Sequence, residues 1–415
     1  MKQYVIIGNG VAAAGCIEGI RSVDTGGSIA VVSEEKRPVY CRPLISYYLE
    51  GKTDLDKMNY RAPDFYEKTG CKILYGQRAV RIDNKAKTVI LDNGSTLPFD
   101  TLCVAAGSAP VIPPVAGLET VKRPFSFMTI DDTLALSAAV STKSRVLIVG
   151  AGLIGLKCAE GLKDRAASIT VCDLADRVLS SILDTDCAAI IQARLESNGI
   201  RFLLGDSVEC FDGSTAMLKS GKTMEFDVLV LAVGVRANSA LVRDMGGKVH
   251  SGILVNDRME TSIPGVYAAG DCTECDDISC GRKRVLALFP NAYMQGYAAG
   301  VNMAGGDQVF DNAIPMNSIG FFGLHAMTAG SCFGEDQGGE CYEEKSDGKI
   351  KRLFTRNGYL TGFTLIGETD RAGIYTSLIR ERIPLASIQF GVLQKKATYA
   401  AFPPDIRRKK FGGVV

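Results

Sequence analysis

The sequence predicts an α/β protein in which one doubly wound unit occurs twice, followed by a smaller α+β domain. Two glycine-rich turns carry this prediction, Gly8-Asn9-Gly10-Val11-Ala12-Ala13 and Gly150-Ala151-Gly152-Leu153-Ile154-Gly155. Each turn follows a run of four apolar residues, at 4–7 and 146–149, and precedes a helical pattern. A strand, a glycine turn and a helix in this order are typical of dinucleotide binding. The sequence therefore predicts two Rossmann-like dinucleotide-binding domains.

The small residues of each turn have separate tasks. The first glycine makes the tight bend, the second lets the backbone approach a pyrophosphate, and the third small residue allows close helix–strand packing. The N–H groups and the dipole at the start of the helix then bind the pyrophosphate. Two such sites predict two dinucleotides, and FAD with NADH is the economical pairing. The six positions are Gly8, Gly10 and Ala13 in the first turn, and Gly150, Gly152 and Gly155 in the second.

A carboxylate follows each turn near the end of the second strand. Glu34 stands 26 residues after Gly8, near the place where a carboxylate binds the adenosine ribose. Asp173 ends the apolar segment 168–173, and it favours NADH over NADPH because a carboxylate repels a 2′-phosphate. Arg177 leaves an alternative open, since it can receive that phosphate or pair with a neighbouring aspartate.

The remaining patterns set the domain organisation. An Asn93-Gly94 hairpin turn lies within the alternating segment 72–97, and the strand 100–104 runs into a loop at 105–110. Strand signals at 350–354 and 359–366 with an amphipathic helix at 372–382 predict the separate α+β domain. We expect an FAD-binding domain at 1–112 and 239–315, an NAD-binding domain at 113–238, and a C-terminal interface domain at 316–415.

Composition excludes several classes of partner. The formal net charge is +1, so no global field points to nucleic acid or to anionic lipid. No apolar run approaches the length of about 20 residues that a membrane helix needs. A strand begins by Tyr4 and leaves no room for a signal peptide, so the 13 cysteines are expected to be reduced thiols of a cytoplasmic protein.

Taken together, these residues resemble the FAD- and NAD-dependent pyridine nucleotide-disulphide oxidoreductases. The marks are both glycine turns, the 105–110 loop (a variant of Ala-Thr-Gly-x-x-Pro) and the segment 261–271, which ends in Ala-Ala-Gly-Asp. The resemblance implies that Asp271, after Gly270, binds the flavin ribityl chain. Ala106, Gly107 and Gly234 are expected to bind the cofactors as well.

The segment Tyr40-Cys41-Arg42-Pro43-Leu44-Ile45-Ser46 and the tail domain most resemble one branch of this family. That branch contains NADH:rubredoxin reductases, nitrite reductase flavoproteins and the flavoprotein subunits that accompany carbon monoxide dehydrogenases. The resemblance implies that Arg42, Pro43 and Ser46 line the flavin site.

The chain departs from the family pattern at three positions. Cys41 stands two residues before the usual redox cysteine, whose place is taken by Pro43, so we expect no thiol relay. Tyr47 replaces a lysine and Lys157 replaces a glutamate of relatives. A cation beside the flavin would favour its reduced state, and the alternative is that Lys157 extends to solvent. Lys157, Arg42 and Tyr47 are therefore the candidate catalytic residues.

Two further patterns are weaker. The spacing of Cys272, Cys275 and Cys280 resembles part of a metal ligand set, and Cys332 and Cys341 keep that option open, but structural thiols and no metal are expected. The last 45 residues hold nine Lys/Arg against two acids, which suits an acidic electron carrier.

The predicted function is electron transfer from NADH through FAD to a rubredoxin, a ferredoxin or an iron–sulfur protein. The alternatives are an NADH oxidase that reduces dioxygen and a non-catalytic flavoprotein that serves as a scaffold or redox sensor. The oligomeric state stays open, with a homodimer as one option.

Overall fold

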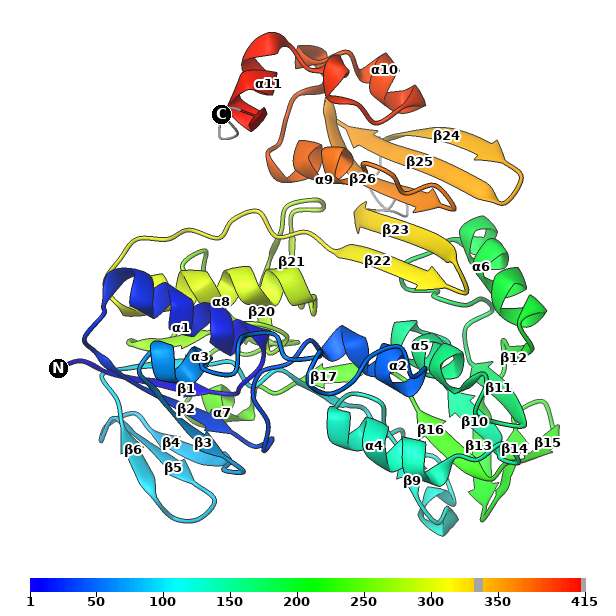
Figure 1. Cartoon of the computed structure of the whole chain (residues 1–415), viewed down its shortest axis with the longest axis horizontal. Helices are drawn as coiled ribbons and strands as arrows, with labels where there is room; N and C mark the ends of the chain where they lie inside the picture. Colours follow the sequence, from blue (N-terminus) through cyan, green and yellow to red (C-terminus); the bar gives the residue numbers. More distant parts are fainter. Residues whose placement is uncertain (332–338, 412–415) are drawn as a thin grey trace. The chain divides into compact units, whose positions relative to one another are not determined.

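The computed structural model describes residues 1–331 and 339–411 (Figure 1). The chain divides into two compact units, and each is described by itself. The first contains residues 1–174, 201–276 and 283–311, and the second contains residues 175–200, 277–282 and the chain from 312.

The first unit contains a parallel sheet in the order β19-β7-β1-β2-β3. Its central strand aligns Ile7 with Val32 of one neighbour and with Val104 of the other. The edge strand β19 comes from much later in the chain than the other four strands. The strands are β1 (Gln3–Ile7), β2 (Ser28–Ser33), β3 (Cys71–Tyr75), β7 (Thr101–Val104) and β19 (Val266–Ala268).

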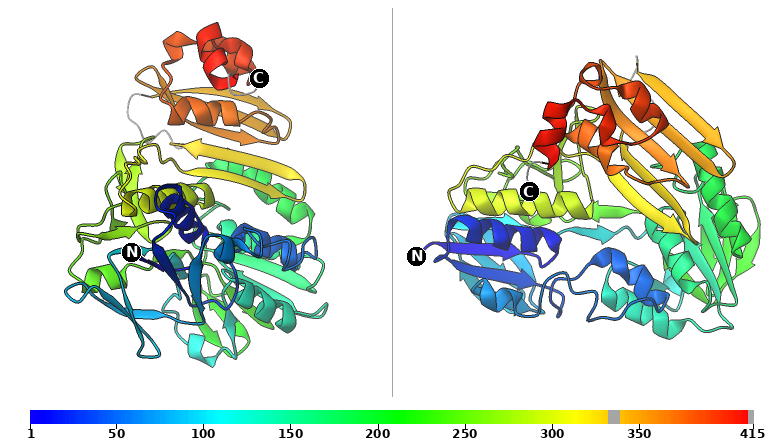
Figure 2. Two further views of the ribbon diagram at one scale, coloured as in Figure 1. Left: turned by 60° about the vertical axis from the view of Figure 1, so that its left-hand side comes forward. Right: turned by 45° about the horizontal axis from the view of Figure 1, so that its top comes forward.

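Two parallel helices, α1 (Val11–Val23) and α8 (Phe289–Met303), lie side by side against this sheet (Figures 1 and 2). Glycines bring their backbones together, because a Cβ on Gly15 would lie 2.4 Å from the Tyr293 carbonyl oxygen. Ala12, at the start of α1, lies opposite Gly296 in the middle of α8. Small residues at these positions therefore let the two helix backbones lie close together.

A second parallel sheet repeats this plan in the order β12-β11-β10-β16-β9. Val149 aligns with Cys172 and with Leu231, as Ile7 does with its two neighbours in the first sheet. Helix α5 (Leu153–Leu162) follows the second glycine turn, and α4 (Ile130–Ala139) precedes the sheet's central strand. The strands are β9 (Pro124–Phe125), β10 (Arg145–Val149), β11 (Ser168–Asp173), β12 (Ile200–Leu204) and β16 (Val228–Leu231).

Smaller elements connect the two sheets. A ribbon of β8 (Ser108–Pro110) and β17 (Val235–Ala237) pairs the outgoing and returning chain antiparallel. A short helix, α2 (Ile45–Leu49), follows the 3-10 turn η1 (Arg42–Leu44). Two three-stranded antiparallel sheets complete the pattern: β4 (Ala79–Asp83), β5 (Thr88–Leu91) and β6 (Thr96–Pro98), and β13 (Val208–Asp212), β14 (Thr215–Leu218) and β15 (Thr223–Glu225). The Asn93-Gly94 turn connects β5 and β6, as predicted.

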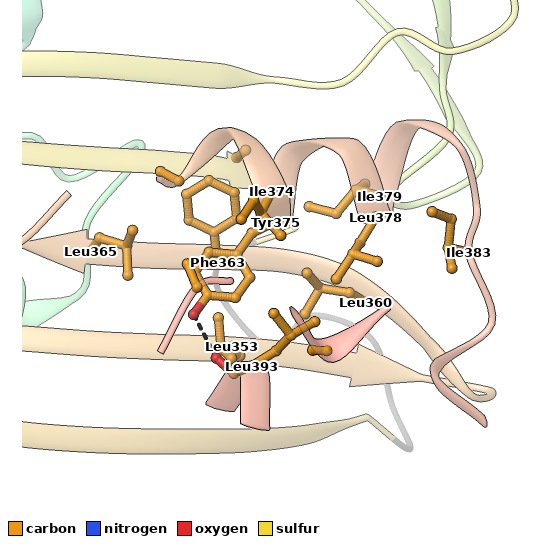
Figure 3. Packing of buried hydrophobic residues seen from close by; sticks show 14 of the residues in the cluster. Leu353, Leu360, Phe363, Leu365, Ile374, Tyr375, Leu378, Ile379, Ile383 and Leu393 are labelled. Carbon is orange, nitrogen blue, oxygen red and sulfur yellow. Dashed lines mark hydrogen bonds between the residues drawn. The ribbon is translucent and has the colours of Figure 1, made fainter. Parts of the chain in front are cut away.

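The second unit is α+β, as predicted. Its antiparallel sheet has the order β22-β23-β26-β25-β24, and α9 (Gly373–Arg380) packs against it. Figure 3 shows this core, in which the Tyr375 hydroxyl donates a 2.7 Å hydrogen bond to the Leu393 carbonyl. The strands are β22 (Met316–Phe321), β23 (Leu324–Gly330), β24 (Glu340–Ser346), β25 (Lys349–Arg356) and β26 (Tyr359–Ile366).

Helix α6 (Thr185–Ser197) also clusters with the second unit. The Arg352 guanidinium on β25 pairs with Asp184, the N-cap of this helix, and with Asp186 in its first turn. Sequence places residues 175–200 within the NAD-binding segment, and the domain boundaries stay predictions.

Candidate dinucleotide sites

The first glycine turn has the geometry that a dinucleotide needs. Gly8 has φ 109°, and a Cβ there would lie 2.1 Å from the Ala105 carbonyl oxygen. A Cβ on Gly10 would meet no described atom within 4 Å, so this position opens onto unfilled space. Ala13 is fully buried beneath the turn. The residues therefore fit a pyrophosphate at the start of α1, where helix N–H groups need acceptors.

Asp271 supplies a half-buried carboxylate to the same site. It follows Gly270 at the end of β19, and the Ser108 hydroxyl donates a long 3.5 Å hydrogen bond to it. Burial raises the pKa of Asp271, while the charge of Arg42 and the Ser108 bond oppose this rise. A carboxylate has about four acceptor positions. The half-buried Asp271 is thus suited to bind ligand hydroxyls such as those of a ribityl chain.

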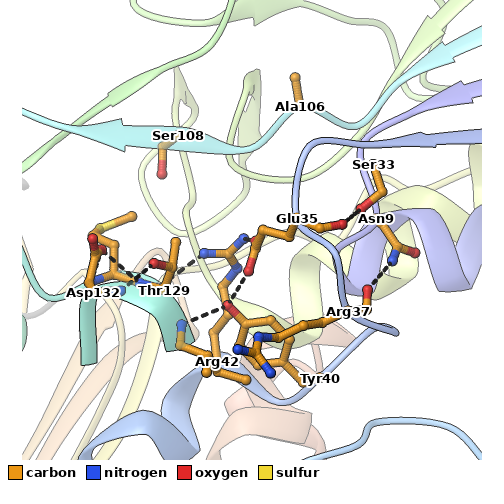
Figure 4. A network of polar contacts seen from close by, with 12 residues as sticks. Asn9, Ser33, Glu35, Arg37, Tyr40, Arg42, Ala106, Ser108, Thr129 and Asp132 are labelled. Carbon is orange, nitrogen blue, oxygen red and sulfur yellow. Dashed lines mark hydrogen bonds and ion pairs between the residues drawn. The ribbon is translucent and has the colours of Figure 1, made fainter. Parts of the chain in front are cut away.

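A polar network holds Arg42 near this site (Figure 4). Its guanidinium pairs with Glu35 and donates a 3.0 Å hydrogen bond to the Met128 carbonyl. The Tyr40 hydroxyl donates a 2.7 Å hydrogen bond to the same glutamate and accepts one from the Ile130 N–H. The network therefore fixes the loop after β2 against the start of α4.

The neighbouring acids of this loop differ in placement. Glu34 is exposed directly after β2, while Glu35 is half-buried within the Arg42 network. Sequence reasoning named Glu34 and missed Glu35. The Gly8 N–H donates to the Val32 carbonyl, and the Gly150 N–H donates to the Cys172 carbonyl. Ser33 therefore occupies the position beside the first turn that Asp173 occupies beside the second. The ribose role of Glu34 stays a prediction.

The segments between the two sheets contain further predicted site residues. Ser46 is buried and donates a 3.3 Å hydrogen bond to the Pro43 carbonyl. The Asn238 side chain donates a 2.9 Å hydrogen bond to the Ala106 carbonyl. Gly107 and Gly234 have φ of 65° and 110°, and a Cβ on either would meet no described atom within 4 Å. Both loops therefore leave room for ligands.

The second glycine turn repeats the geometry of the first. Gly150 has φ 116°, and a Cβ on Gly155 would lie 2.0 Å from its carbonyl oxygen. A Cβ on Gly152 would meet no described atom within 4 Å. The Ala151 N–H donates a 2.6 Å hydrogen bond to the Asp173 carboxylate, which fixes that side chain beside the turn.

Helices α2 and α5 pack against each other. A Cβ on Gly161 would lie 3.1 Å from the Leu49 Cβ, so the backbones are close. The Lys157 ammonium lies 5.1 Å from the centre of the Tyr47 ring and pairs with Glu160. Its side chain is only 19% exposed, which argues against extension to solvent.

The cysteines have separate surroundings. Burial raises the pKa of the half-buried Cys41 thiol. Cys272 contacts the Val104 carbonyl at 3.3 Å, whereas Cys275 accepts a hydrogen bond from Gln295. Within residues 1–331 and 339–411, no group of three or more His, Cys, Asp or Glu side chains has the arrangement of a metal site. Cys332 lies outside the described residues.

Comparison with known proteins identifies the family of this chain. The sequence profile described as "Pyridine nucleotide-disulphide oxidoreductase" matches residues 2–296, so the chain belongs to this family. The expected family membership, the α/β fold class with Rossmann-like parallel sheets, and the FAD and NAD(H) cofactors are confirmed. The protein is an FAD-dependent NAD(P)H oxidoreductase.

The chain spans most of the length of two of the relatives below and half of the length of the third. The chain is 31% identical over 398 residues to the NADH-dependent phenylglyoxylate dehydrogenase subunit epsilon of Aromatoleum evansii, covering 93% of each chain. It is 32% identical over 392 residues to an NADH oxidase of Methanocaldococcus jannaschii, covering 88% of this chain and 87% of the other. It is 31% identical over 390 residues to the assimilatory nitrate reductase electron transfer subunit of Bacillus subtilis, covering 92% of this chain but only 50% of that protein.

Among solved structures, the covalent putidaredoxin reductase–putidaredoxin complex has a chain with the same fold. The TM-score is 0.87 at 23% identity, and the match covers 96% of this chain and 99% of that chain. Within its described residues, the protein has no helix with the length and apolarity to cross a bilayer.

Proposed function

We propose that this chain passes electrons from NADH through FAD to an electron-transfer protein, such as a rubredoxin, a ferredoxin or an iron–sulfur subunit, without a redox-active disulfide. The state of Cys41 carries this proposal. Because burial raises its pKa, the thiol stays protonated at neutral pH. A protonated thiol is a poor nucleophile. Electrons then leave the flavin directly.

In this proposal, the chain's own residues bind and orient the two cofactors. Bound FAD supplies the hydride acceptor and can release electrons singly. The turns at Gly10 and Gly152 would hold the two pyrophosphates, and Asp271 would take the ribityl hydroxyls. Asp173 would accept from a ribose hydroxyl and repel a 2′-phosphate. Positioning of this kind supplies much of the rate acceleration in hydride transfer.

The NADH preference has a second support. The Arg177 guanidinium pairs with Asp176 at 2.8 Å and donates a 3.1 Å hydrogen bond to the Leu183 carbonyl. It is therefore engaged by other partners. Asp173, fixed by the turn, then decides between the two nicotinamide cofactors. The second glycine turn keeps all three glycines and Asp173, so a nicotinamide site is present, and a non-catalytic scaffold would not need one.

The names of two relatives support a protein acceptor. One is a subunit of a larger dehydrogenase, and the other is an electron transfer subunit of a nitrate reductase. The match to the M. jannaschii NADH oxidase supports a second candidate, in which dioxygen is the acceptor.

Stopped-flow reduction under anaerobic conditions tests the proposal. NADH should bleach the flavin, and a rubredoxin or a ferredoxin should reoxidise it faster than air-saturated buffer does. Cys41→Ser should keep both rates close to wild type. A charge-transfer band in the two-electron-reduced wild type that this variant loses would show a working thiolate and would refute the proposal. Reoxidation by dioxygen alone would favour the oxidase.

A further inference from the structure

Helix α5 contains a buried carboxylate that the proposed function does not use. Glu160 is 8% exposed and its neighbours Cys158, Ala159 and Leu162 are buried. A carboxylate in such surroundings is costly unless it is paired. The Lys157 ammonium, one turn earlier on the same helix, forms an ion pair with it. The helix thus holds a charged pair on its buried side.

The pair lies against an aromatic ring from another element. Tyr47 on α2 has the Lys157 ammonium at 5.1 Å from its ring centre and the Lys52 ammonium at 5.9 Å. The Lys157 side chain is 19% exposed, whereas the Lys52 side chain is 62% exposed. Cation–π attraction is stronger when the cation is desolvated. Lys157 is therefore the cation that this ring fixes.

The position of the pair links the two dinucleotide sites. Helix α5 begins at the second glycine turn, with Gly152 as its N-cap. Helix α2 begins three residues after Arg42, whose charge acts on Asp271 in the first site. The Tyr47–Lys157 contact is thus a contact between the flavin-site motif and the nicotinamide-site helix. Hydride transfer requires that the two bound rings meet.

We propose that Glu160 is a positioning residue, which holds the Lys157 ammonium over Tyr47 beside the place where nicotinamide and flavin meet. This inference rests on the proposed function. An ammonium there stabilises the electron-rich reduced flavin. Glu160 acts on the flavin potential through the place that its ion pair gives to this ammonium.

Flavin midpoint potentials of purified holoenzymes test this inference. Lys157→Met should disfavour the reduced flavin about tenfold, which is a fall of about 30 mV for a two-electron couple. Glu160→Gln should shift the potential in the same direction, because the released ammonium leaves its place over Tyr47, and the double variant should match Lys157→Met. A shift of Glu160→Gln in the opposite direction would show that the carboxylate acts by its own charge and would overturn the positioning role. Glu160→Asp keeps the charge and should change little. Lys163→Met, which removes a cation at the C-terminal end of the same helix, is the matched control.

The outcomes separate the two proposals. Unchanged potentials in Lys157→Met and Glu160→Gln holoenzymes that keep FAD and the wild-type thermal unfolding would overturn the positioning role. If Glu160→Gln does not fold, Lys157→Met decides by itself. A wild type whose flavin NADH cannot reduce would instead refute the proposed function.

Discussion

At the scale of single residues, Asp271 after β19 combines partial burial with spare acceptor capacity. Asp271→Ala should weaken FAD binding about ten- to hundredfold, because a hydrogen bond to a charged group contributes about 1.5–3 kcal/mol. Absorbance of the purified variant and its FAD titration measure this loss. Asp271→Asn, which keeps an acceptor oxygen without the charge, should lie between the variant and wild type. Full FAD retention in Asp271→Ala would exclude the residue from the site.

The same residue predicts a pH dependence. Burial raises the Asp271 pKa in the FAD-free protein, so the side chain stays protonated to a higher pH than an ordinary aspartate. FAD needs the carboxylate as acceptor, and its binding must release that proton. FAD affinity should therefore fall as the pH drops through the raised pKa. Titrations at several pH values should show this fall in wild type and not in Asp271→Asn.

Asp173 determines the expected nicotinamide preference. Wild type should be reduced much faster by NADH than by NADPH, and Asp173→Ala should narrow this difference because the charge that repels a 2′-phosphate is gone. Stopped-flow reduction with both cofactors measures the two rates. Equal reduction of wild type by both cofactors would show that Asp173 has no such role.

Sequence reasoning succeeded for residues whose task is local. Gly8 and Gly150 are recognisable because the turn, the preceding strand and the following helix are adjacent in sequence. Glu35 was missed because its partners Tyr40 and Arg42 become visible only when the loop is folded. The Lys157–Glu160 pair has the spacing of neighbours on a helix, but its contact with Tyr47 depends on how α2 packs on α5.

At the scale of elements, the α1–α8 pair places the first glycine turn. Each helix contributes two glycines four residues apart, and the close approach positions the start of α1 under the flavin-site loops. The sequence contains both glycine pairs, at Gly15 and Gly19 and at Gly296 and Gly300. Their pairing was not predicted because the two helices are far apart in the chain.

Gly300→Ala tests this packing. Its Cβ would lie 2.1 Å from the Cys16 carbonyl oxygen and 2.8 Å from the Ile20 nitrogen, both of which belong to the backbone. Overpacking of this kind costs about 1–3 kcal/mol or more, which exceeds the helix-propensity gain of about 1 kcal/mol. The variant should unfold at a lower temperature than wild type, and it should release FAD at a lower temperature as well.

A helix glycine with space around it provides the control. A Cβ on Gly391 in α10 (Phe390–Lys395) would meet no described atom within 4 Å. Gly391→Ala should therefore leave the unfolding temperature unchanged or raise it slightly. Equal stability of the Gly300 and Gly391 variants would mean that the α1–α8 contact tolerates a methyl group.

At the scale of the whole molecule, the basic C-terminal segment contrasts with a chain of net charge +1. Helix α11 (Pro404–Phe411) carries part of this charge. Lys410 pairs with Glu381 at 2.6 Å and also bonds to Ser377, so it anchors the helix. Arg407 and Arg408 are exposed. A docking role for the segment therefore depends on these two arginines more than on Lys410.

Charge reversal of both arginines tests whether the segment attracts an acidic electron carrier. Arg407→Glu/Arg408→Glu should slow the bimolecular reduction of an acidic rubredoxin or ferredoxin several-fold at low salt, while turnover of NADH with a small dye stays unchanged. Electrostatic steering acts on the encounter rate and leaves the hydride transfer alone. Raising the salt to physiological strength should slow wild type in the same way, because the Debye length shrinks to about 8 Å.

The matched control reverses two exposed lysines elsewhere, with Lys219→Glu/Lys222→Glu near the β14–β15 turn. This variant changes the net charge equally, so a similar slowing would indicate the field of the whole protein and not a docking surface. Stopped-flow rates against salt for the three proteins distinguish the cases. If the C-terminal segment steers the acceptor, only the arginine variant loses both the rate and its salt dependence, and rates that are independent of salt in all three would leave this segment without a part in electron transfer.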